Sequence, residues 1–382
     1  MYIRTLIAAV ACIACSVAQA NTFQPGGNMS LGTGGRYGSF GALLPNGTIL
    51  IAGGFNGDNL ASGELYDPQT QTFSWTSTDL SAARGFGNTV VLPDSRVLLI
   101  GGGNFDESGG VANVDIYDPT LGTLAPTGSL HVARTNMMAA LLQDGRVLVT
   151  GGRASDGVTH LASSEIYDPV SATFSMTGSM LIARDNGVAV TLPNGKVLVT
   201  GGGRGDGVSY AEAELYDPAA GTFTTTGSMS VGRDDATATL LSNGKVLVAG
   251  GANNDVPMGT AEIYNPATGT FTPSAATMPA RDFAGAVRLA NGLVLIVGGQ
   301  GDTHGLGDTG ALNDAVTYDS TTDSFTAAGV MATARYYFPT ILMQDGSVFV
   351  AGGYNNDGVV SDTEIYTNAT ADSIFADGFD GP

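Results

Sequence analysis

Aspartates recur at one fixed place in this chain, four residues after the second glycine of a Gly-Gly pair. They are Asp58, Asp106, Asp156, Asp206, Asp255 and Asp357, while Asp302 lies one place earlier in its own unit. Carboxylates gathered from several loops could hold a hard cation such as Ca²⁺. The alternative, which we favour, is a turn in which each aspartate caps its own backbone. No segment has the spacing of an EF-hand loop, so the identity of any bound metal stays unknown.

Arginines form a second repeated set, each 17 residues before the first glycine of a Gly-Gly pair. These repeat arginines are Arg36, Arg84, Arg134, Arg184, Arg233, Arg281 and Arg335. An acid precedes the later tyrosine of six units by two residues, and the sixth unit has Val316 there. A ring of arginines could bind an anionic ligand. Because the pattern recurs in all seven units, we instead expect each arginine to pair with a nearby acid and to be structural.

The sixth unit departs most from the others. Its loop at 300–314 is the longest, and it carries His304 near Asp302 and Asp308. A long, irregular loop on a rigid scaffold is a place where function concentrates, and a tolerated insertion is the equal alternative. The other two histidines, His131 and His160, lie in different units, so we expect no metal site built from the three.

A repeated unit of about 50 residues must position these side chains. Ten residues after each arginine comes an Asn or Asp, usually followed by glycine; the tyrosine follows the Gly-Gly pair, with an aromatic or leucine seven residues later in six units. Asn-Gly is typical of a tight hairpin, because a type I′ turn needs positive φ twice. Each unit therefore predicts four short strands, and seven units predict an all-β, seven-bladed β-propeller.

The two ends of the repeated region predict how the ring closes. The seventh tyrosine, Tyr366, lacks the aromatic residue seven positions later, whereas Thr22-Phe23 is similar to the Thr-Phe of residues 222–223. We predict that residues 22–28 supply the last strand of the seventh blade and pair with residues 361–366. An N-terminal strand that closes the ring would leave no open sheet edge.

The Gly-Gly, tyrosine and phenylalanine positions resemble the kelch repeat, from about residue 22 to 367. The style of the units is similar to the central propeller of galactose oxidase. That resemblance implies a copper site with a cysteine-crosslinked tyrosine and two histidine ligands. The only cysteines are Cys12 and Cys15, both in a segment that we expect to be removed, so copper chemistry of this type is disfavoured and no cofactor is expected.

Residues 1–20 combine Arg4, an apolar run and Ala18-Gln19-Ala20, which is typical of a secretory signal peptide. We expect the propeller at 21–370 and a short acidic tail at 371–382, which resembles the ends of some exported proteins of Gram-negative bacteria. The protein would then be periplasmic or extracellular. No later segment is apolar over 18 residues, so no other membrane span is expected.

The net charge of −20 disfavours nucleic acid and anionic lipid as partners. We expect a monomer that binds a protein or a carbohydrate through the acidic loop face, meaning the loops after the Gly-Gly pairs with Asp58, Asp106, Asp156, Asp206, Asp255, Asp302, His304, Asp308 and Asp357. The alternative is a sugar-active enzyme, either similar to an epimerase or mutarotase or a degenerate relative of galactose oxidase. No catalytic residue can be singled out, so an enzymatic role stays undecided.

Overall fold

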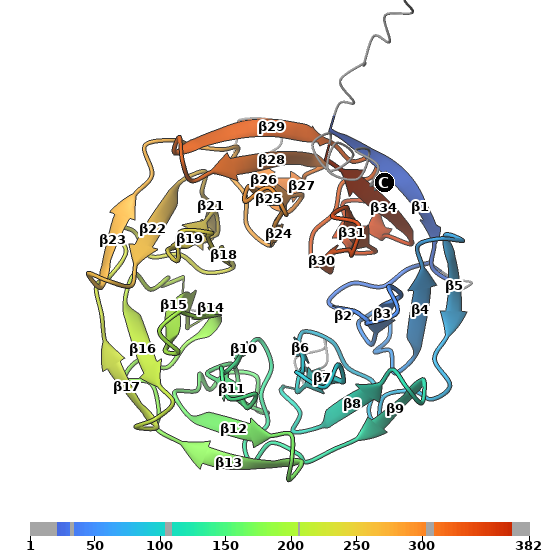
Figure 1. Cartoon of the computed structure of the whole chain (residues 1–382), viewed down its shortest axis with the longest axis horizontal. Coiled ribbons are helices and arrows are strands. Elements are labelled where there is room, and N and C mark those ends of the chain that lie inside the picture. Colours follow the sequence, from blue (N-terminus) through green and yellow to red (C-terminus); the bar gives the residue numbers. More distant parts are fainter. Residues whose placement is uncertain (1–20, 31–33, 104–108, 205–206, 303–308, 369–382) are drawn as a thin grey trace, which may run out of the picture.

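Seven four-stranded antiparallel sheets surround a central axis in the computed structural model (Figure 1). The structure describes residues 21–30, 34–103, 109–204, 207–302 and 309–368. Every helix or strand assigned among these residues is a β-strand. The predicted fold, an all-β, seven-bladed propeller, is therefore confirmed.

Each blade runs outward from the axis in chain order, through strands that we call a, b, c and d. In blade one these are β2 (Phe40–Leu43), β3 (Ile49–Ala52), β4 (Gly63–Asp67) and β5 (Thr72–Trp75). Blades two, three and four follow with β6 (Asn88–Val91), β7 (Val97–Ile100), β8 (Val114–Asp118), β9 (Thr123–Pro126), β10 (Met138–Leu141), β11 (Val147–Thr150), β12 (Ser164–Asp168), β13 (Thr173–Thr177), β14 (Asp185–Thr191), β15 (Val197–Gly203), β16 (Ala213–Asp217) and β17 (Thr222–Thr225). Blade five has β18 (Thr237–Leu240), β19 (Val246–Ala249), β22 (Ala261–Asn265) and β23 (Thr270–Pro273), and blade six has β24 (Gly285–Arg288), β25 (Val294–Val297), β28 (Asp314–Asp319) and β29 (Ser324–Val330).

Blade seven takes its inner strands from the end of the chain and its outermost strand from the beginning. It contains β30 (Thr340–Leu342), β31 (Val348–Ala351), β34 (Asp362–Thr367) and, at the rim, β1 (Thr22–Asn28). Three two-stranded ribbons lie in the b-to-c loops of blades five to seven, namely β20 (Ala252–Asn253) with β21 (Val256–Pro257), β26 (Gln300–Asp302) with β27 (Thr309–Ala311), and β32 (Tyr354–Asn355) with β33 (Gly358–Val359).

The core lies between neighbouring blades, because strand b is covered on both faces. In β3, Ile49 and Ile51 are fully buried against Phe349 of blade seven. The Tyr66 ring of strand c stacks on Phe349 with ring centroids 4.4 Å apart. Continuous apolar runs in strand b are what burial between two sheets requires.

The Gly-Gly pair is needed where strand b meets the next blade. Gly53 has φ of +63°, and a Cβ there would lie 2.4 Å from the carbonyl oxygen of Arg84 in blade two. The next N–H, from Gly54, donates to that same carbonyl at 2.9 Å. Only glycine allows both the positive φ and the close approach.

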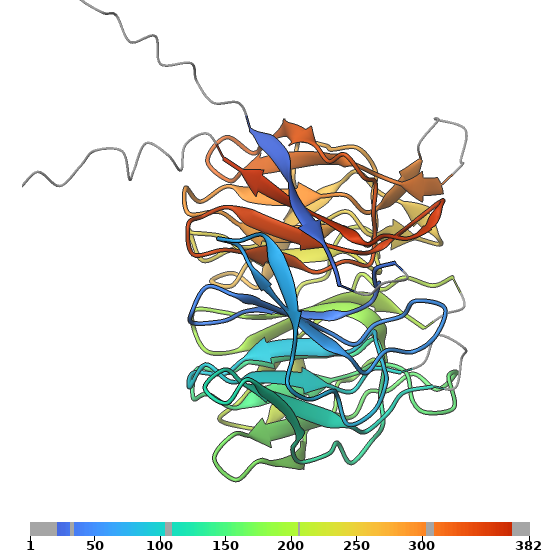
Figure 2. The same ribbon diagram turned by 90° about the vertical axis from the view of Figure 1, so that its right-hand side faces the viewer.

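The N-terminal strand closes the ring as predicted. β1 pairs antiparallel with β34, which ends one residue later than expected, and Phe23 lies opposite Tyr366 with ring centroids 5.2 Å apart. Figure 2 shows β1 crossing the edge of the disc beside β34. The segments 1–20 and 371–382 lie outside the described residues, so the signal peptide and acidic tail stay predictions. Among the described residues no helix is long and apolar enough to cross a membrane.

Removing β1 should destabilise the whole ring. A chain that begins at residue 31 loses the pairing with β34 and exposes that strand's edge. We expect a loss of at least about 2–5 kcal/mol of unfolding free energy, comparable with deletion of a large core side chain, together with self-association. Thermal unfolding and light scattering measure both effects. A chain that begins at residue 21 is the control, and equal stability of the two chains would refute closure by β1.

Candidate functional site

The repeat arginines form a buried clasp in every blade, which we define as the arginine, its acidic partner in strand c and the backbone groups that both bind. In blade three, Arg134 Nη1 donates to the carbonyls of Gly151 at 2.8 Å and Ser163 at 2.9 Å. Its Nη2 lies 3.1 Å from Glu165 Oε1, which also accepts the Val132 N–H. One arginine thus joins the d-to-a connection, the end of strand b and the start of strand c.

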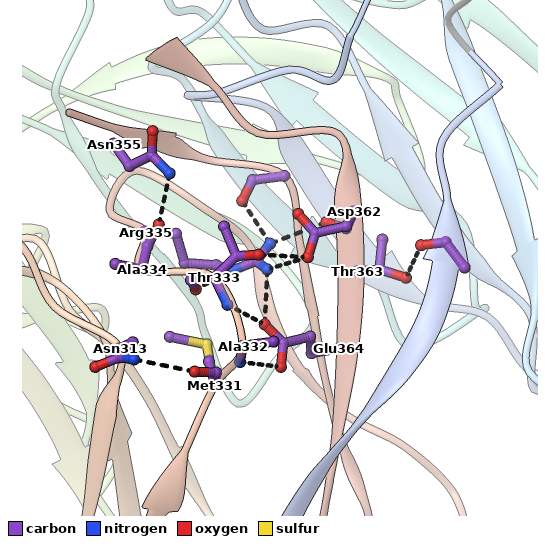
Figure 3. A network of polar contacts seen from close by, with 12 residues as sticks. Asn313, Met331, Ala332, Thr333, Ala334, Arg335, Asn355, Asp362, Thr363 and Glu364 are labelled. Atoms are coloured by element: carbon purple, nitrogen blue, oxygen red, sulfur yellow. Dashed lines mark hydrogen bonds and ion pairs between the residues drawn. The ribbon is translucent and has the colours of Figure 1, made fainter. Parts of the chain in front are cut away.

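All seven arginines are at most 1% exposed, and all seven pair with an acid. The shortest N–O distances of the pairs are 2.8 Å for Arg36–Glu64, 2.8 Å for Arg84–Asp115, 3.1 Å for Arg134–Glu165, 3.2 Å for Arg184–Glu214, 3.4 Å for Arg233–Glu262, 2.6 Å for Arg281–Asp314 and 2.9 Å for Arg335–Glu364. In blade seven Asp362 joins as a second acid, 3.0 Å from Arg335 (Figure 3).

Burial and pairing oppose each other in the clasp. Burial lowers the pKa of Arg134, and the charge of Glu165 raises it again. Burial alone would raise the pKa of Glu165. Hydrogen bonds from His131 and Val132 and the charge of Arg134 outweigh burial, so the pKa of Glu165 is lowered overall. The guanidinium is therefore committed to its acid and to backbone carbonyls, which leaves it unavailable to a ligand.

The aspartates of the acidic loop face lie at separate loop tips. Asp58, Asp156, Asp255 and Asp357 are all exposed. Asp156 caps its own turn, accepting the N–H groups of Val158 and Thr159 at 3.0 and 2.8 Å. The remaining members, Asp106, Asp206, His304 and Asp308, lie outside the described residues, and Asp302 is described only as the backbone end of β26.

The histidines and acids of the described chain do not gather into a metal centre. His131 Nδ1 lies 2.9 Å from Glu165 of its own clasp, and His160 Nε2 lies 3.6 Å from Asp185. Over the described ranges, no three His, Cys, Asp or Glu side chains come together in a way that could hold a metal ion.

A hollow of about 320 Å³ opens at the propeller axis. The residue two places after each repeat arginine lines it, and these seven residues form what we call the axial ring: Gly38, Phe86, Asn136, Asn186, Asp235, Phe283 and Tyr337. All seven have φ between +48° and +62°. Aromatic residues rarely adopt this conformation, so the ring is strained, and strain of this kind gathers at functional sites.

Hydrogen bonds connect the axial ring from blade to blade. Its N–H groups donate to the carbonyl of the preceding member along six steps: Gly38 to Tyr337 at 2.9 Å, Phe86 to Gly38 at 2.9 Å, Asn136 to Phe86 at 3.1 Å, Asn186 to Asn136 at 3.1 Å, Asp235 to Asn186 at 3.0 Å and Phe283 to Asp235 at 3.2 Å. These bonds hold the backbone of the axial ring in place around the hollow.

One side of the hollow is aromatic. Phe86 and Tyr337 of the axial ring lie 5.1 Å apart between ring centroids, and Phe283 lies 4.4 Å from Tyr337. Tyr336 packs on Tyr337 at 5.1 Å, and Tyr37 packs on Phe86 at 6.0 Å. The ring faces of blades one, two, six and seven therefore form one continuous aromatic wall.

Acidic residues of blades four to six stand at the hollow and next to it. Asp235 lines the hollow, and Asp185, Asp234 and Asp282 directly precede the lining residues Asn186, Asp235 and Phe283. Asp185 is 2% exposed and binds Arg153 at 2.7 Å. Asp234, Asp235 and Asp282 have no ion pair with a basic side chain among the described residues. One oxygen of Asp234 and one of Asp282 are buried without any hydrogen-bond partner.

Burial and the charge of neighbouring carboxylates raise the pKa of Asp234, Asp235 and Asp282. Burial raises the pKa of Asp282 to about 7, with further contributions from Asp234 and Asp255. The pKa of Asp235 is raised well above its usual range by burial and by Asp234 and Asp282, and the pKa of Asp234 is raised mainly by burial. Perturbed acids in a hollow are a recognised mark of a functional site.

These residues were not predicted from the sequence, although a signal was present. The arginine pattern is uniform, and the signal lies in the residue that follows each arginine. That residue is aspartate in units four to six, but tyrosine in units one and seven. This departure from the repeat distinguishes the acidic blades around the hollow from the aromatic ones.

Comparisons with known proteins agree with this fold. A family model described as the Kelch motif matches residues 36–74. A solved structure of a fungal alcohol oxidase of the AA5 family, in complex with copper, is similar with a TM-score of 0.71 and 18% sequence identity, over 90% of this chain and 75% of that chain. At this identity the likeness shows the fold alone. No curated protein sequence matches the chain. The resemblance to kelch propellers is thus confirmed.

Breaking one clasp should cost far more than breaking an exposed pair of the same chemistry. Arg134→Met leaves Glu165 buried without its cation, so we expect a loss of about 3–5 kcal/mol in unfolding free energy. Adding Glu165→Gln should recover part of that loss. The control is Arg146→Met, which removes a partly exposed ion pair with Asp144 and should cost at most about 1 kcal/mol. Urea denaturation measures all of these variants, and equal losses at Arg134 and Arg146 would contradict the clasp.

The pKa of Asp282 predicts how stability changes with pH. Between the pKa of the unfolded chain, about 4, and the folded value of about 7, only the folded protein holds this proton. The unfolding free energy therefore falls as pH rises through this window, by at most roughly 4 kcal/mol. Asp282→Asn should flatten that fall, and the exposed Asp79→Asn should leave it unchanged. Denaturant titrations at pH 5 and pH 8 measure it, and parallel curves for Asp282→Asn and the parent would refute the assignment.

Proposed function

We propose that this protein is an exported binding module that holds a carbohydrate over the axial hollow. The observation that carries the proposal is the aromatic wall at the hollow beside three carboxyl groups, those of Asp234, Asp235 and Asp282, which form no ion pair with a basic side chain among the described residues. The sequence placed the binding surface on the loop tips, at Asp58, Asp156, Asp255 and Asp357. We move it inward, to the residues that directly follow the repeat arginines.

The chemistry of the hollow suits a sugar better than a flat protein surface. The C–H faces of a pyranose ring pack on aromatic rings, and its hydroxyl groups donate to carboxylates. A hollow of about 320 Å³ lies at the lower end of the range for small-ligand pockets, which is about 300–1,000 Å³. The hydrogen-bonded axial ring fixes the lining residues before the ligand arrives, which reduces the entropy lost on binding.

Export and the partner classes stay part of the proposal. Residues 1–20 carry the features of a signal peptide, which supports a periplasmic or extracellular location. The net charge of −20 supports neutral or cationic ligands over nucleic acid and anionic lipid. We propose a monomer that requires no copper, and we leave Ca²⁺ at the loop tips as a secondary possibility.

One observation supports catalysis as a second candidate function. A carboxyl group with a pKa of about 7, such as Asp282, can act as a general acid or base near neutral pH. A sugar epimerase or mutarotase would need this property. Under that alternative, Asp282→Asn would abolish turnover of a bound sugar, measured as anomeric exchange by NMR, while leaving binding intact.

Loss of one aromatic ring from the wall should weaken carbohydrate binding. Tyr336→Ala removes a half-buried ring beside the hollow, and we expect at least a tenfold rise in Kd, about 1.4 kcal/mol. The matched control is Trp75→Ala, because Trp75 is 50% exposed on the outer strand β5. Calorimetry against neutral oligosaccharides of glucose, galactose, mannose and N-acetylglucosamine gives the constants.

The same panel can refute the proposal. Absence of binding to every oligosaccharide and to their amino-sugar forms would exclude a carbohydrate module. Equal weakening by Tyr336→Ala and Trp75→Ala would place the ligand away from the axis. Weakening by exchange of the loop-tip aspartates, with Tyr336→Ala without effect, would return the binding surface to the loop tips.

A further inference from the structure

The carboxyl groups at the hollow and next to it outnumber the basic side chains that pair with them among the described residues. Every repeat arginine is committed to a clasp, and Arg153 is committed to Asp185, with N–O distances of 2.7 and 2.9 Å. Asp234, Asp235 and Asp282 come from two adjacent connections, directly after Arg233 and Arg281. The Phe283 N–H donates to the Asp235 carbonyl at 3.2 Å, so the two connections lie side by side. Asp234 and Asp282 both raise the pKa of Asp235, and Asp234 raises that of Asp282.

Two carboxylate oxygens in this cluster need a donor. Asp282 is only 7% exposed, and its Oδ1 is buried without a hydrogen-bond partner. Asp234 Oδ1 is in the same condition. Leaving a buried polar atom unsatisfied costs about 1–3 kcal/mol, and more when the group is charged. A ligand that brings several N–H donors and a positive charge would remove both costs.

Aromatic rings stand beside the same carboxyl groups. Phe283 follows Asp282 directly and packs on Tyr337 with ring centroids 4.4 Å apart, and Tyr336 packs on Tyr337 at 5.1 Å. The Asp282 charge raises the pKa of both tyrosines, so they lie near it. Carboxylates combined with aromatic faces bind organic ammonium groups through charge-assisted hydrogen bonds and cation–π contacts.

We propose that Asp234, Asp235 and Asp282 bind the protonated amine of an amino sugar. This inference rests on the proposed function, in which the aromatic wall holds the sugar ring. The ammonium group has three N–H donors, which match the unsatisfied oxygens of Asp234 and Asp282 and the carboxyl group of Asp235. A neutral hydroxyl or an N-acetyl group at the same place supplies fewer donors and no charge.

Binding of the amine should release protons. The charged and titratable groups around Asp282 are Asp185, Arg153 and His160 from blades three and four, Asp234, Asp235 and Asp255 from blade five, and Tyr336 and Tyr337 from blade seven. An ammonium group among them favours ionised carboxylates. Below pH 7 the sugar amine remains protonated, as α-amino groups titrate near about 8, so affinity should rise between pH 5.5 and 7, by up to about tenfold per pH unit.

The test compares oligosaccharides of glucosamine and galactosamine with their N-acetylated counterparts, by calorimetry on the full chain. We expect at least one amine form to bind roughly tenfold more tightly than its N-acetylated partner at pH 7. Its apparent enthalpy should differ between phosphate and Tris buffers, because protons are released. Asp282→Asn should remove the preference for the amine, and Asp79→Asn, with the same change in net charge, should retain it.

The outcomes separate this inference from the proposed function. Equal binding of amine and N-acetylated forms, with Tyr336→Ala still weakening both, would overturn the ammonium site and leave the carbohydrate module standing. A preference for the amine that Asp79→Asn and Asp282→Asn reduce equally would also overturn it, because long-range charge would then explain the preference. Tighter binding of the amine without proton release would exclude the three raised carboxyl groups as its partners.

Discussion

A guanidinium buried in a β-sheet protein must find its partners within the fold, and this requirement determines how each blade is assembled. In blade three Arg134 can stay charged only where Glu165 and two backbone carbonyls surround it. The d-to-a connection, strand b and strand c therefore have one relative placement in which the charge is satisfied. Breaking any contact leaves a charge unsatisfied in the interior, which costs far more than an exposed pair.

The clasps also fix what lies next to them. Because each arginine is held in place, the second residue after it reaches the axis in every blade and lines the hollow. The frame keeps its symmetry, while Tyr336 and Asp282 occupy equivalent positions with opposite chemistry. A ring of similar units can therefore carry an asymmetric site through changes at single positions beside a constant one.

The sequence predicted the fold well, because the fold depends on local spacing. Asn-Gly turns, apolar runs and Gly-Gly pairs are readable one unit at a time, and the missing outer strand of unit seven pointed to Thr22-Phe23. The hollow was not predicted, because its residues are brought together by ring closure. Tyr37 and Tyr354, far apart in sequence, come into contact only once blade seven meets blade one.

Blade six shows the same limit on a smaller scale. The sequence shows that Val316 replaces the expected acid but gives no reason to look two residues earlier. Residues two apart in a strand face the same side of the sheet, and Asp314 takes over the clasp, 2.6 Å from Arg281. Blade six therefore keeps the ion pair of the clasp, although the acid lies two residues earlier in the strand than in the other blades.

The two ends of the repeated region meet at the seam between blades one and seven. Hydrogen bonds join these two ends both at the outer rim and at the axis. At the rim, β1 pairs with β34; at the axis, the N–H of Gly38 donates to the carbonyl of Tyr337. The aromatic wall crosses this seam, with Tyr37 on one side and Tyr354 on the other, 5.0 Å apart between ring centroids. A ligand bound to that wall would contact blades one and seven at once, so ligand binding and closure of the ring would stabilise each other.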